Sequence, residues 1–268
     1  MFWDYVQRGT PREEVARWRP AIQELQDELF EQSEGLIPSG VEILMWSVGN
    51  ATVFQDDEPA FIQRAQAFAK EHQIYFFPSI LMLKPDRVEC ENKVLAITPE
   101  GEIAYTYHKA RPSPAEHIPE TEGKLLAVDT RYGRISTAIC YDMFFSDLIR
   151  QAGKQQVDIL LVPADEPMPE LDPFDTQSAM FRGIENGCSV LRSTLEGLTM
   201  GVDYQGNVLS RMSFYTTTEN RTTITHVPTR GVRTLYALAG DWFAYAAILF
   251  TIGMIVWAVC QRVGQKRG

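Results

Sequence analysis

Cys140 has the clearest chemical potential in this sequence, because a polar segment follows an apolar one at that point. The run 134–140 is mostly apolar, and Tyr141 and Asp142 follow the cysteine directly. The pattern predicts a strand that ends at Cys140 and a helix that begins two or three residues later. Backbone N–H groups and the dipole at a helix N-terminus favour the thiolate, the nucleophilic form of cysteine. The alternative is a buried structural cysteine at the end of a core strand.

A lysine at the mouth of a proline-rich loop is the second feature. Lys109 ends the segment 105–109, and the loop 110–114 leads from it to Glu116 and His117. Such a lysine could stabilise the negative charge of a tetrahedral intermediate; a solvated surface lysine is the alternative. The four histidines show no metal-ligand spacing and the four cysteines form no C-x-x-C pair, so we expect no metal site.

Composition limits the class of protein. The 268 residues include 25 Lys and Arg against 35 Asp and Glu, a formal net charge of −10, and 45% hydrophobic residues. This hydrophobic content is typical of a folded protein with a sizeable core and excludes a disordered chain. An acidic chain has no overall basic surface for nucleic acid, so we expect no nucleic-acid partner. The scattered cysteines argue against a disulfide-rich scaffold.

Hydrophobic periodicity predicts the elements that would position these side chains. Helices are expected at 13–32, 58–72, 143–156 and 175–187. Pro20 would kink the first of them or start a second helix within 13–32. Strands are expected at 41–46, 74–83, 157–164 and twice within 188–212, with hairpins at 93–109 and 125–140. This order of helices and strands predicts an α/β fold, an α-β-β-α sandwich.

The C-terminal segment predicts a membrane anchor. Residues 242–260 carry no charge and are long enough to cross a bilayer core of about 30 Å. Arg262, Lys266 and Arg267 follow the span, so the positive-inside rule places the C-terminus in the cytoplasm and the main domain on the extracytoplasmic side. The chain would be a single-pass membrane protein, with no export signal visible at its N-terminus. The alternative is a buried core helix.

Four blocks of sequence resemble the carbon–nitrogen hydrolase (nitrilase) superfamily, specifically its apolipoprotein N-acyltransferase branch. They are the strand pattern ILMW ending at Trp46, Y-x-K ending at Lys109 with the proline-rich loop and glutamate after it, ICYD around Cys140, and the segment 181–197. The segment RGVRTLYALAGDW and the apolar span after it are similar to the same branch. The resemblance implies a hydrolase-like domain over 1–235, a transmembrane helix over 242–260 and a short basic tail over 261–268.

The resemblance also implies a Glu–Lys–Cys catalytic triad and a reaction. Cys140 would be the nucleophile, Lys109 would stabilise the oxyanion, and Glu116 would match a second glutamate after the lysine. Tyr141 and Asp142 would bind substrate. An acyl chain would move from a phospholipid to Cys140 as a thioester and then to the N-terminal amine of a lipoprotein, without a cofactor.

Position 48 departs from the pattern of the family. The family's Trp-Pro-Glu reads Trp46-Ser47-Val48 here, and a valine cannot accept a proton. We expect that the acidic residues at 56–58 lie too far along the chain to substitute for the missing glutamate. Activity is therefore expected to be reduced or absent.

Two further departures keep other functions open. The family's first core strand is not evident before the helix at 13–32, and Glu196 stands where the family has an asparagine. A catalytically inactive scaffold that binds a partner is one alternative. An amidase-type hydrolase that uses water as the acceptor is the other.

Overall fold

The first sheet is built from the N-terminal half of the chain. The computed structural model describes residues 9–114, 116–168, 172–215 and 221–265. The strands of this sheet are β1 (Ile43–Met45), β2 (Ala51–Phe54), β3 (Tyr75–Phe77), β4 (Ser79–Leu83), β5 (Cys90–Ile97) and β6 (Ile103–His108). Their order is β1-β3-β5-β4-β2, and β6 pairs with β5. The antiparallel β5–β6 pair is the predicted hairpin, and its last residue is followed by Lys109.

The second sheet positions the predicted nucleophile. Its strands are β7 (Ala127–Thr130), β8 (Gly133–Thr137), β9 (Ile159–Ala164), β10 (Ser189–Thr194), β11 (Leu198–Val202) and β12 (Val208–Ser213). They lie in the order β12-β11-β10-β9-β8-β7. The three central strands, β8, β9 and β10, are parallel, so their carboxyl ends meet at one edge of the sheet.

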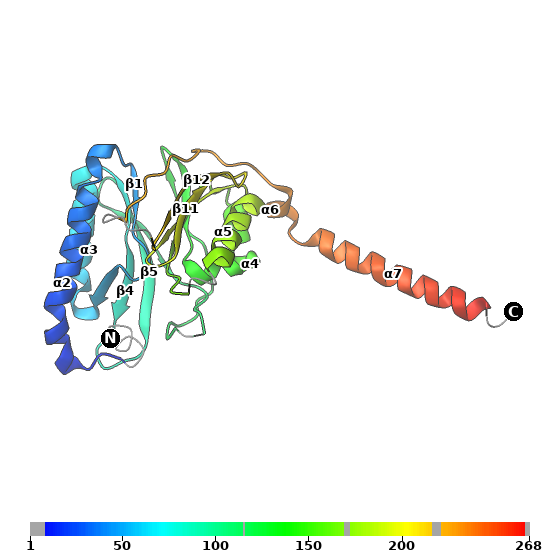
Figure 1. Cartoon of the computed structure of the whole chain (residues 1–268), viewed down its shortest axis with the longest axis horizontal. Helices are drawn as coiled ribbons and strands as arrows, with labels where there is room; N and C mark the ends of the chain where they lie inside the picture. The colour runs from blue at the N-terminus through cyan, green and yellow to red at the C-terminus, as the bar shows by residue number, and fades with distance from the viewer. Residues whose placement is uncertain (1–8, 115, 169–171, 216–220, 266–268) are drawn as a thin grey trace.

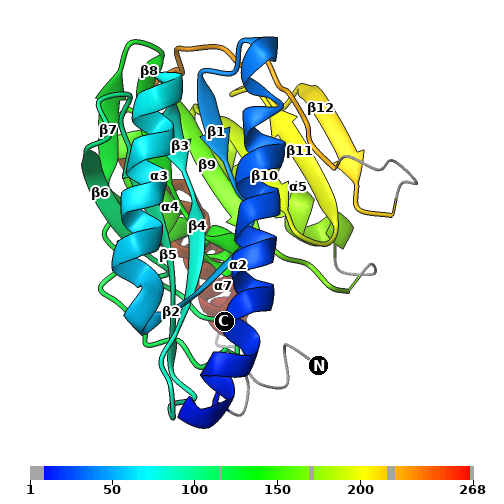
Figure 2. The ribbon, with the colours of Figure 1, turned by 90° about the vertical axis from the view of Figure 1, so that its left-hand side faces the viewer.

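The helices cover the outer faces of the two sheets. Helices α2 (Arg12–Glu34) and α3 (Glu58–His72) lie over the first sheet, and α4 (Ser146–Lys154) and α5 (Asp172–Asn186) lie over the second (Figure 1). Seen from the α2 side, α2 and α3 run in front of the strands (Figure 2). The layers are therefore helix, sheet, sheet and helix, which confirms the predicted α-β-β-α sandwich.

Two apolar layers hold the sandwich together. The layer between the sheets includes Val48, Phe77, Ile135 and Leu160, all at most 5% exposed. The layer beneath α2 and α3 is rich in aromatic rings: Phe30, Trp46, Phe61, Phe68 and Phe76. These strands are buried on both faces, which explains why they read as continuous apolar runs rather than as alternating patterns.

Several elements differ from the sequence-based predictions. Helix α2 is one continuous helix that contains Pro20, so the prediction of a second helix starting there is wrong. The segment predicted as one strand at 74–83 is two strands, because Pro78 lacks an N–H for the ladder. The helix predicted at 143–156 begins instead as a 3-10 turn, η3 (Cys140–Phe144), followed by α4.

An irregular segment and a short helix connect the domain to its C-terminal helix. Residues 221–234 run across the sandwich to α6 (Leu235–Ala239), and Gly187 at the end of α5 accepts a backbone hydrogen bond from the Val232 N–H. Arg150 of α4 donates to three carbonyls of α6, those of Tyr236, Ala237 and Leu238. These contacts fix the point at which the chain leaves the domain.

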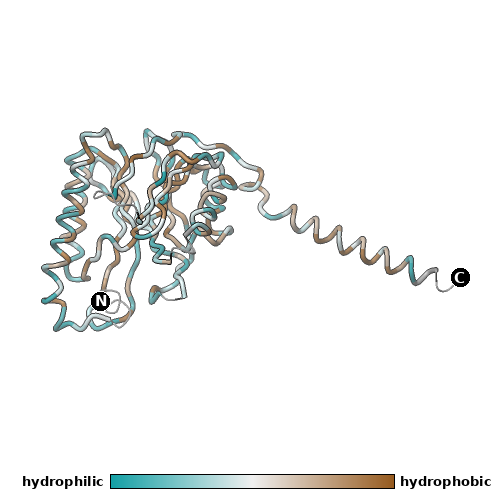
Figure 3. The backbone as a smooth tube through the Cα atoms, viewed as in Figure 1, coloured by the Kyte–Doolittle hydropathy of each residue, from teal (hydrophilic) through white to brown (hydrophobic). Residues whose placement is uncertain are grey.

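Helix α7 (Trp242–Gln265) projects away from the domain on the side of α4 and α5 (Figure 1). Its window Trp242–Arg262 is 21 residues long and apolar enough to cross a membrane, and none of that window is buried against the domain. Figure 3 shows apolar residues along this exposed helix. Exposing so many apolar side chains to water would cost free energy. By its length and composition, this one apolar C-terminal helix could span a membrane.

Candidate active site

Cys140 lies at the carboxyl end of β8 in an uncommon backbone conformation. Its φ is 47°, in the left-handed region, which a residue with a side chain rarely adopts. Such strain persists where surrounding contacts hold it, and it clusters at functional sites. The thiol remains partly exposed, and its Sγ lies 3.5 Å from the main-chain oxygen of Asp165. The backbone therefore turns sharply at the predicted nucleophile and presents its sulfur to the edge of the sheet.

Asp142 holds this turn in place. Its carboxylate accepts from the Ile139 N–H at 2.9 Å, from the Tyr107 hydroxyl at 2.8 Å, and from the N–H groups of Ala110 and Arg111 at 3.1 and 2.7 Å. Asp142 is fully buried, at 0% exposure. No surface is left with which it could bind a substrate, so the predicted substrate contact does not fit this structure. Its contacts instead tie the turn at Cys140 to the loop that follows Lys109.

Lys109 and Glu116 form a buried ion pair at the start of that loop. The Lys109 Nζ donates to both carboxylate oxygens of Glu116, at 2.7 and 2.5 Å, and the Ser113 N–H donates to Glu116 at 2.6 Å. Lys109 is 2% exposed, which rules out a solvated surface lysine. The Lys109 ammonium also interacts electrostatically with Cys140. The structure thus brings together Cys140, Lys109 and Glu116, which lie on separate segments of the sequence.

Burial of the thiol opposes its ionisation. Burial raises the pKa of Cys140, and the positive charges of Lys109 and Arg192 only partly offset that rise. Burial alone would lower the pKa of Lys109, but the charge of Cys140 in its thiolate form and the charge and hydrogen bonds of Glu116 outweigh it, so the pKa is raised and the ammonium keeps its proton. Cys140 starts a five-residue 3-10 turn rather than an α-helix, so the helix N-terminus that was expected to favour the thiolate does not begin at this residue. A proton acceptor is needed.

Position 48 supplies no such acceptor. Val48 is 5% exposed and packs within the apolar layer between the sheets. The preceding Ser47 shares a hydrogen bond of 2.7 Å with Ser193 at the end of β10, so the segment that carries Val48 lies beside the end of that strand. The acidic residues at 56–58 bind elsewhere: Asp56 contacts Arg12, and Asp57 binds Arg19.

Two further acidic residues lie at the same edge of the sheet: Asp165, which the sequence analysis missed, and Glu196, to which it gave no role. Asp165 follows β9, and Glu196 follows β10. The Glu196 N–H donates to Asp165 Oδ1 at 3.3 Å, and the Glu166 N–H donates to the Glu196 main-chain oxygen at 3.2 Å. Three parallel strands end side by side here, so Asp165 lies next to Cys140.

Aromatic side chains flank the thiol on the α5 side. The ring of Tyr141 packs against Phe144 and Phe145 at centroid distances of 5.2 and 5.5 Å. Phe144 stacks on Phe174 of α5, which is 60% exposed. Tyr141 is partly exposed, so it can contact a bound molecule as predicted, and the row of rings offers it an apolar surface.

A cavity of about 350 Å³ opens beside this cluster rather than at the thiol. It lies between the end of α2, β1 and the strands β10 and β11, and Ser47, Arg192 and Ser193 are part of its lining. Cys140, Lys109 and Glu116 are not among its described lining residues. In the described parts of the chain, no group of three or more histidines, cysteines and carboxylates could hold a metal ion.

Comparisons with known proteins agree with this arrangement. A model of the carbon–nitrogen hydrolase family matches residues 37–235. An apolipoprotein N-acyltransferase from Photobacterium profundum is 24% identical over 256 residues, which cover 84% of this chain and 49% of the relative. One from Haemophilus influenzae is 32% identical over 133 residues, which cover 47% of this chain and 24% of the relative. The chain thus spans about half the length of the first of these relatives.

Solved structures show the same fold. An amidase from Nesterenkonia sp. superposes with a TM-score of 0.64 at 17% sequence identity, covering 72% of this chain and 81% of that one. A mutant of the amidase from Nesterenkonia sp. AN1, in which acrylamide has added to the active-site cysteine, also gives a TM-score of 0.64 at 17% identity. It covers 72% of this chain and 84% of that one.

Proposed function

The chain belongs to the carbon–nitrogen hydrolase family, and from that premise we propose that it is a membrane-anchored N-acyltransferase of low intrinsic activity. The acyl group would come from a phospholipid, and the acceptor would be the N-terminal amine of a lipoprotein. One observation carries the proposal: the buried Lys109–Glu116 pair lies against the strained Cys140, in a chain whose relatives are named apolipoprotein N-acyltransferases.

The first half of the reaction is acylation of Cys140. The thiolate attacks the carbonyl carbon of the phospholipid ester, and the electron pair of the C=O bond moves to the oxygen. The protonated Lys109 interacts with the sulfur and would stabilise this oxyanion, as a preorganised charge in a buried site does. Collapse of the tetrahedral intermediate breaks the ester C–O bond and releases a lysophospholipid.

The second half transfers the acyl group to an amine. The neutral amine attacks the thioester carbonyl, the oxyanion forms again beside Lys109, and the thiolate of Cys140 leaves. Glu116 holds Lys109 in position through both steps, since it accepts two hydrogen bonds from the ammonium. Both substrates would be lipids or lipidated, which is consistent with a domain joined directly to an apolar helix.

A catalytically inactive scaffold is the second candidate, and Val48 favours it. A general base contributes about 10²- to 10⁴-fold in rate, so a site without one could bind substrates and turn them over very slowly. An amidase-type hydrolase is the third: the solved amidases share the fold, and the choice between water and an amine as acceptor depends on what reaches the thioester.

Intact-mass analysis tests the proposal. The full chain in phospholipid vesicles is incubated with and without an N-terminal S-diacylglyceryl-cysteine peptide. We expect an acyl adduct on the wild-type chain that decreases when the peptide is added, as acylated peptide appears. Cys140→Ala should abolish the adduct, whereas Cys90→Ala, a matched control at a buried cysteine, should keep it.

Other outcomes distinguish the candidates. Free fatty acid without acylated peptide would indicate a hydrolase. The absence of any Cys140-dependent adduct would indicate a scaffold. An adduct that survives Cys140→Ala would remove Cys140 as the nucleophile.

A further inference from the structure

The thiol of Cys140 needs a proton acceptor that position 48 does not provide. Burial keeps the thiol protonated near neutral pH, and Val48 is buried among apolar side chains. Glu116 is already occupied by two hydrogen bonds from Lys109 and one from the Ser113 N–H. Asp142 is occupied by four donors. No described contact joins a carboxylate oxygen of Glu116 or Asp142 to the Cys140 sulfur.

Asp165, the residue that follows β9, contacts the thiol through its main chain. The main chain of Asp165 touches the Cys140 sulfur at 3.5 Å, and its side chain accepts a hydrogen bond from one backbone donor, the Glu196 N–H at 3.3 Å. Asp165 is partly exposed, so its carboxylate can reach a water molecule or a substrate. Its electrostatic interaction with Lys109 places it in the same cluster as the thiol.

The two departures from the family pattern meet at this corner. Ser47, next to Val48, forms a hydrogen bond with Ser193. Three residues after Ser193, the Glu196 N–H donates a hydrogen bond to the Asp165 carboxylate. The Leu195 N–H donates to the Ala164 oxygen at 3.0 Å, which fixes the ends of β9 and β10 to each other. The segment that carries position 48 is therefore bonded to the same strand end that holds Asp165.

We propose that Asp165 accepts the proton of Cys140 and so takes over the role that a glutamate at position 48 has in the family. This inference rests on the proposed function for its substrate, but the proton transfer itself concerns only the two side chains. The transfer is direct or runs through one water molecule, which is within the reach of a general base.

The surrounding charges suit this role. Asp165 interacts with Lys109, Glu166 and Glu196, and the thiol interacts with Lys109, Glu116 and Arg192. Burial raises the pKa of Asp165 to about 6, and the neighbouring Glu196 and Glu166 add to the rise, while Lys109 lowers it. A carboxylate with this pKa is ionised at pH 7.5 and is more basic than an ordinary aspartate, as a proton acceptor working near neutral pH should be.

The step balances. Asp165 takes the proton from sulfur as the C–S bond forms and the carbonyl electrons move to oxygen. When the ester C–O bond breaks, the leaving alkoxide receives that proton from Asp165. In the second half, the attacking amine loses its proton to Asp165 as the C–N bond forms. The proton then passes to the Cys140 thiolate, which restores the starting state.

Alkylation of Cys140 by iodoacetamide tests the proposal on the full chain. The rate at pH 7.0 is measured by peptide mass spectrometry for wild type, Asp165→Asn, Val48→Glu and the double variant. A general base removes the thiol proton as the sulfur attacks, so Asp165→Asn should slow alkylation at least about 10-fold. Val48→Glu should restore the rate in the double variant. Glu166→Gln, at the adjacent buried carboxylate, is the matched control and should change the rate less than 3-fold.

The opposite sign would overturn the inference. If Asp165 were only a nearby negative charge, Asp165→Asn would lower the pKa of Cys140 and speed up alkylation. An unchanged or faster rate therefore contradicts the proposal. A slower rate that Val48→Glu does not restore contradicts it as well, because it indicates a structural defect. The acyl-adduct measurement is separate: an Asp165-dependent alkylation rate without any acyl adduct would overturn the proposed function and leave the proton acceptor in place.

Discussion

The backbone at Cys140 stores strain, and Asp142 is the residue that holds it. A non-glycine residue in the left-handed region costs about 1–3 kcal/mol, so neighbouring contacts must fix it. Asp142 binds the Ile139 N–H, one residue before the turn, and two N–H groups of the loop after Lys109. The nucleophile and the oxyanion lysine therefore share one support.

Removing that support should destabilise the domain strongly. Asp142→Ala leaves three buried backbone donors and the Tyr107 hydroxyl without their acceptor, at about 1–3 kcal/mol for each unsatisfied group. We expect a loss of at least about 3 kcal/mol in the free energy of unfolding, measured by denaturation in detergent. Asp129→Ala is the matched control, because the Asp129 side chain on β7 is 79% exposed, and should change stability by less than about 0.5 kcal/mol. Equal effects for both variants would contradict the supporting role.

The raised pKa of Asp165 also predicts how stability depends on pH. A carboxyl with a pKa of about 6 in the folded state, above its ordinary value, keeps its proton better when folded. The folded state then binds more protons between pH 4 and pH 6, so stability falls as the pH rises through this window.

Asp165→Asn removes that contribution. Relative to wild type, the variant should gain up to about 3 kcal/mol at pH 8, and the gain should nearly vanish near pH 4. Paired denaturation curves at the two pH values measure it. A difference that is independent of pH would show that the carboxyl titrates normally.

At this scale the sequence identified the reactive groups but not their environment. Cys140, Lys109 and Glu116 were found through local motifs, and the structure brings them together. Asp165 was missed, because its partners arrive from β8 and β10 and no local pattern marks a contact between strand ends. The sequence left open whether Cys140 is exposed or buried for the same reason: burial depends on tertiary packing, which a helix N-terminus alone does not reveal.

At the scale of elements, the C-terminal segment is held against the sandwich at a few close contacts. Gly187 ends α5 with a φ of +71°, and a Cβ placed there would lie 2.0 Å from the Val232 oxygen. The residue therefore needs both the left-handed conformation and the absence of a side chain, so that residues 231–234 can pass.

Gly187→Ala should loosen the connection to α6 and α7. Gly40→Ala is the matched control, because Gly40 has a similar φ of +77° but a Cβ placed there would have no neighbour within 4 Å. We expect Gly40→Ala to cost about 1 kcal/mol, from backbone strain alone. Gly187→Ala should cost clearly more and should increase hydrogen exchange in 228–239. Equal losses of stability in the two variants would show that the backbone at Val232 moves away from the added Cβ at no cost in free energy.

The elements themselves were predicted well where periodicity was long. Helix α3 was predicted with its bounds, Glu58–His72, and the β5–β6 hairpin and β9 were predicted within a few residues. The four-residue strand β2 and the five-residue helix α6 were missed, because neither is long enough to show a period. The parallel pairing of β2 with β4 and the Arg150 contacts to α6 stabilise them instead.

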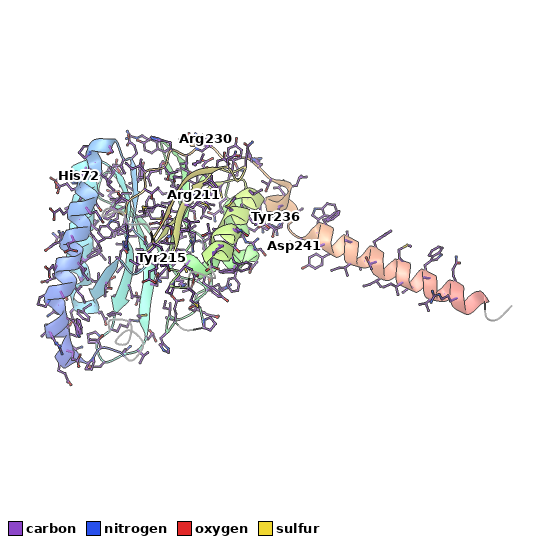
Figure 4. All side chains as sticks on the ribbon, in the orientation of Figure 1. His72, Arg211, Tyr215, Arg230, Tyr236 and Asp241 are labelled. Atoms are coloured by element: carbon purple, nitrogen blue, oxygen red, sulfur yellow. The ribbon has the colours of Figure 1, made fainter. Side chains whose placement is uncertain are left out.

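At the scale of the whole molecule, α7 is the element whose apolar side chains do not pack against the domain. Tyr236 and Asp241 mark the junction between α6 and α7, on the side of the sandwich opposite to His72 at the end of α3 (Figure 4). Beyond this junction every side chain through Arg262 is exposed. Insertion into a bilayer would bury these side chains.

The anchor can be tested by extraction. We expect the full chain to stay with membranes in alkaline carbonate. Replacing Ile252 and Ile255 by Asp, each more than half exposed in α7, should release it, because two charges near the bilayer centre cost about 5 kcal/mol or more. The matched control replaces Leu25 on α2, which is also exposed, by Asp and should leave the chain in the membrane. Release of the wild-type chain would contradict the anchor.

Orientation is the last property that the charge distribution predicts. Arg262 follows the span, and Lys266 and Arg267, which lie outside the described residues, extend the positive flank, whereas Asp241 precedes it. The positive-inside rule then places the sandwich and its thiol on the extracytoplasmic side. Single cysteines at Leu25 and at Gly268, in a chain whose native cysteines are replaced, report the two sides to a membrane-impermeant maleimide. Intact cells should be labelled at position 25 alone, and permeabilised cells at both. Labelling of intact cells at position 268 alone would place Cys140 in the cytoplasm and, with it, the proposed acyl transfer on the opposite leaflet.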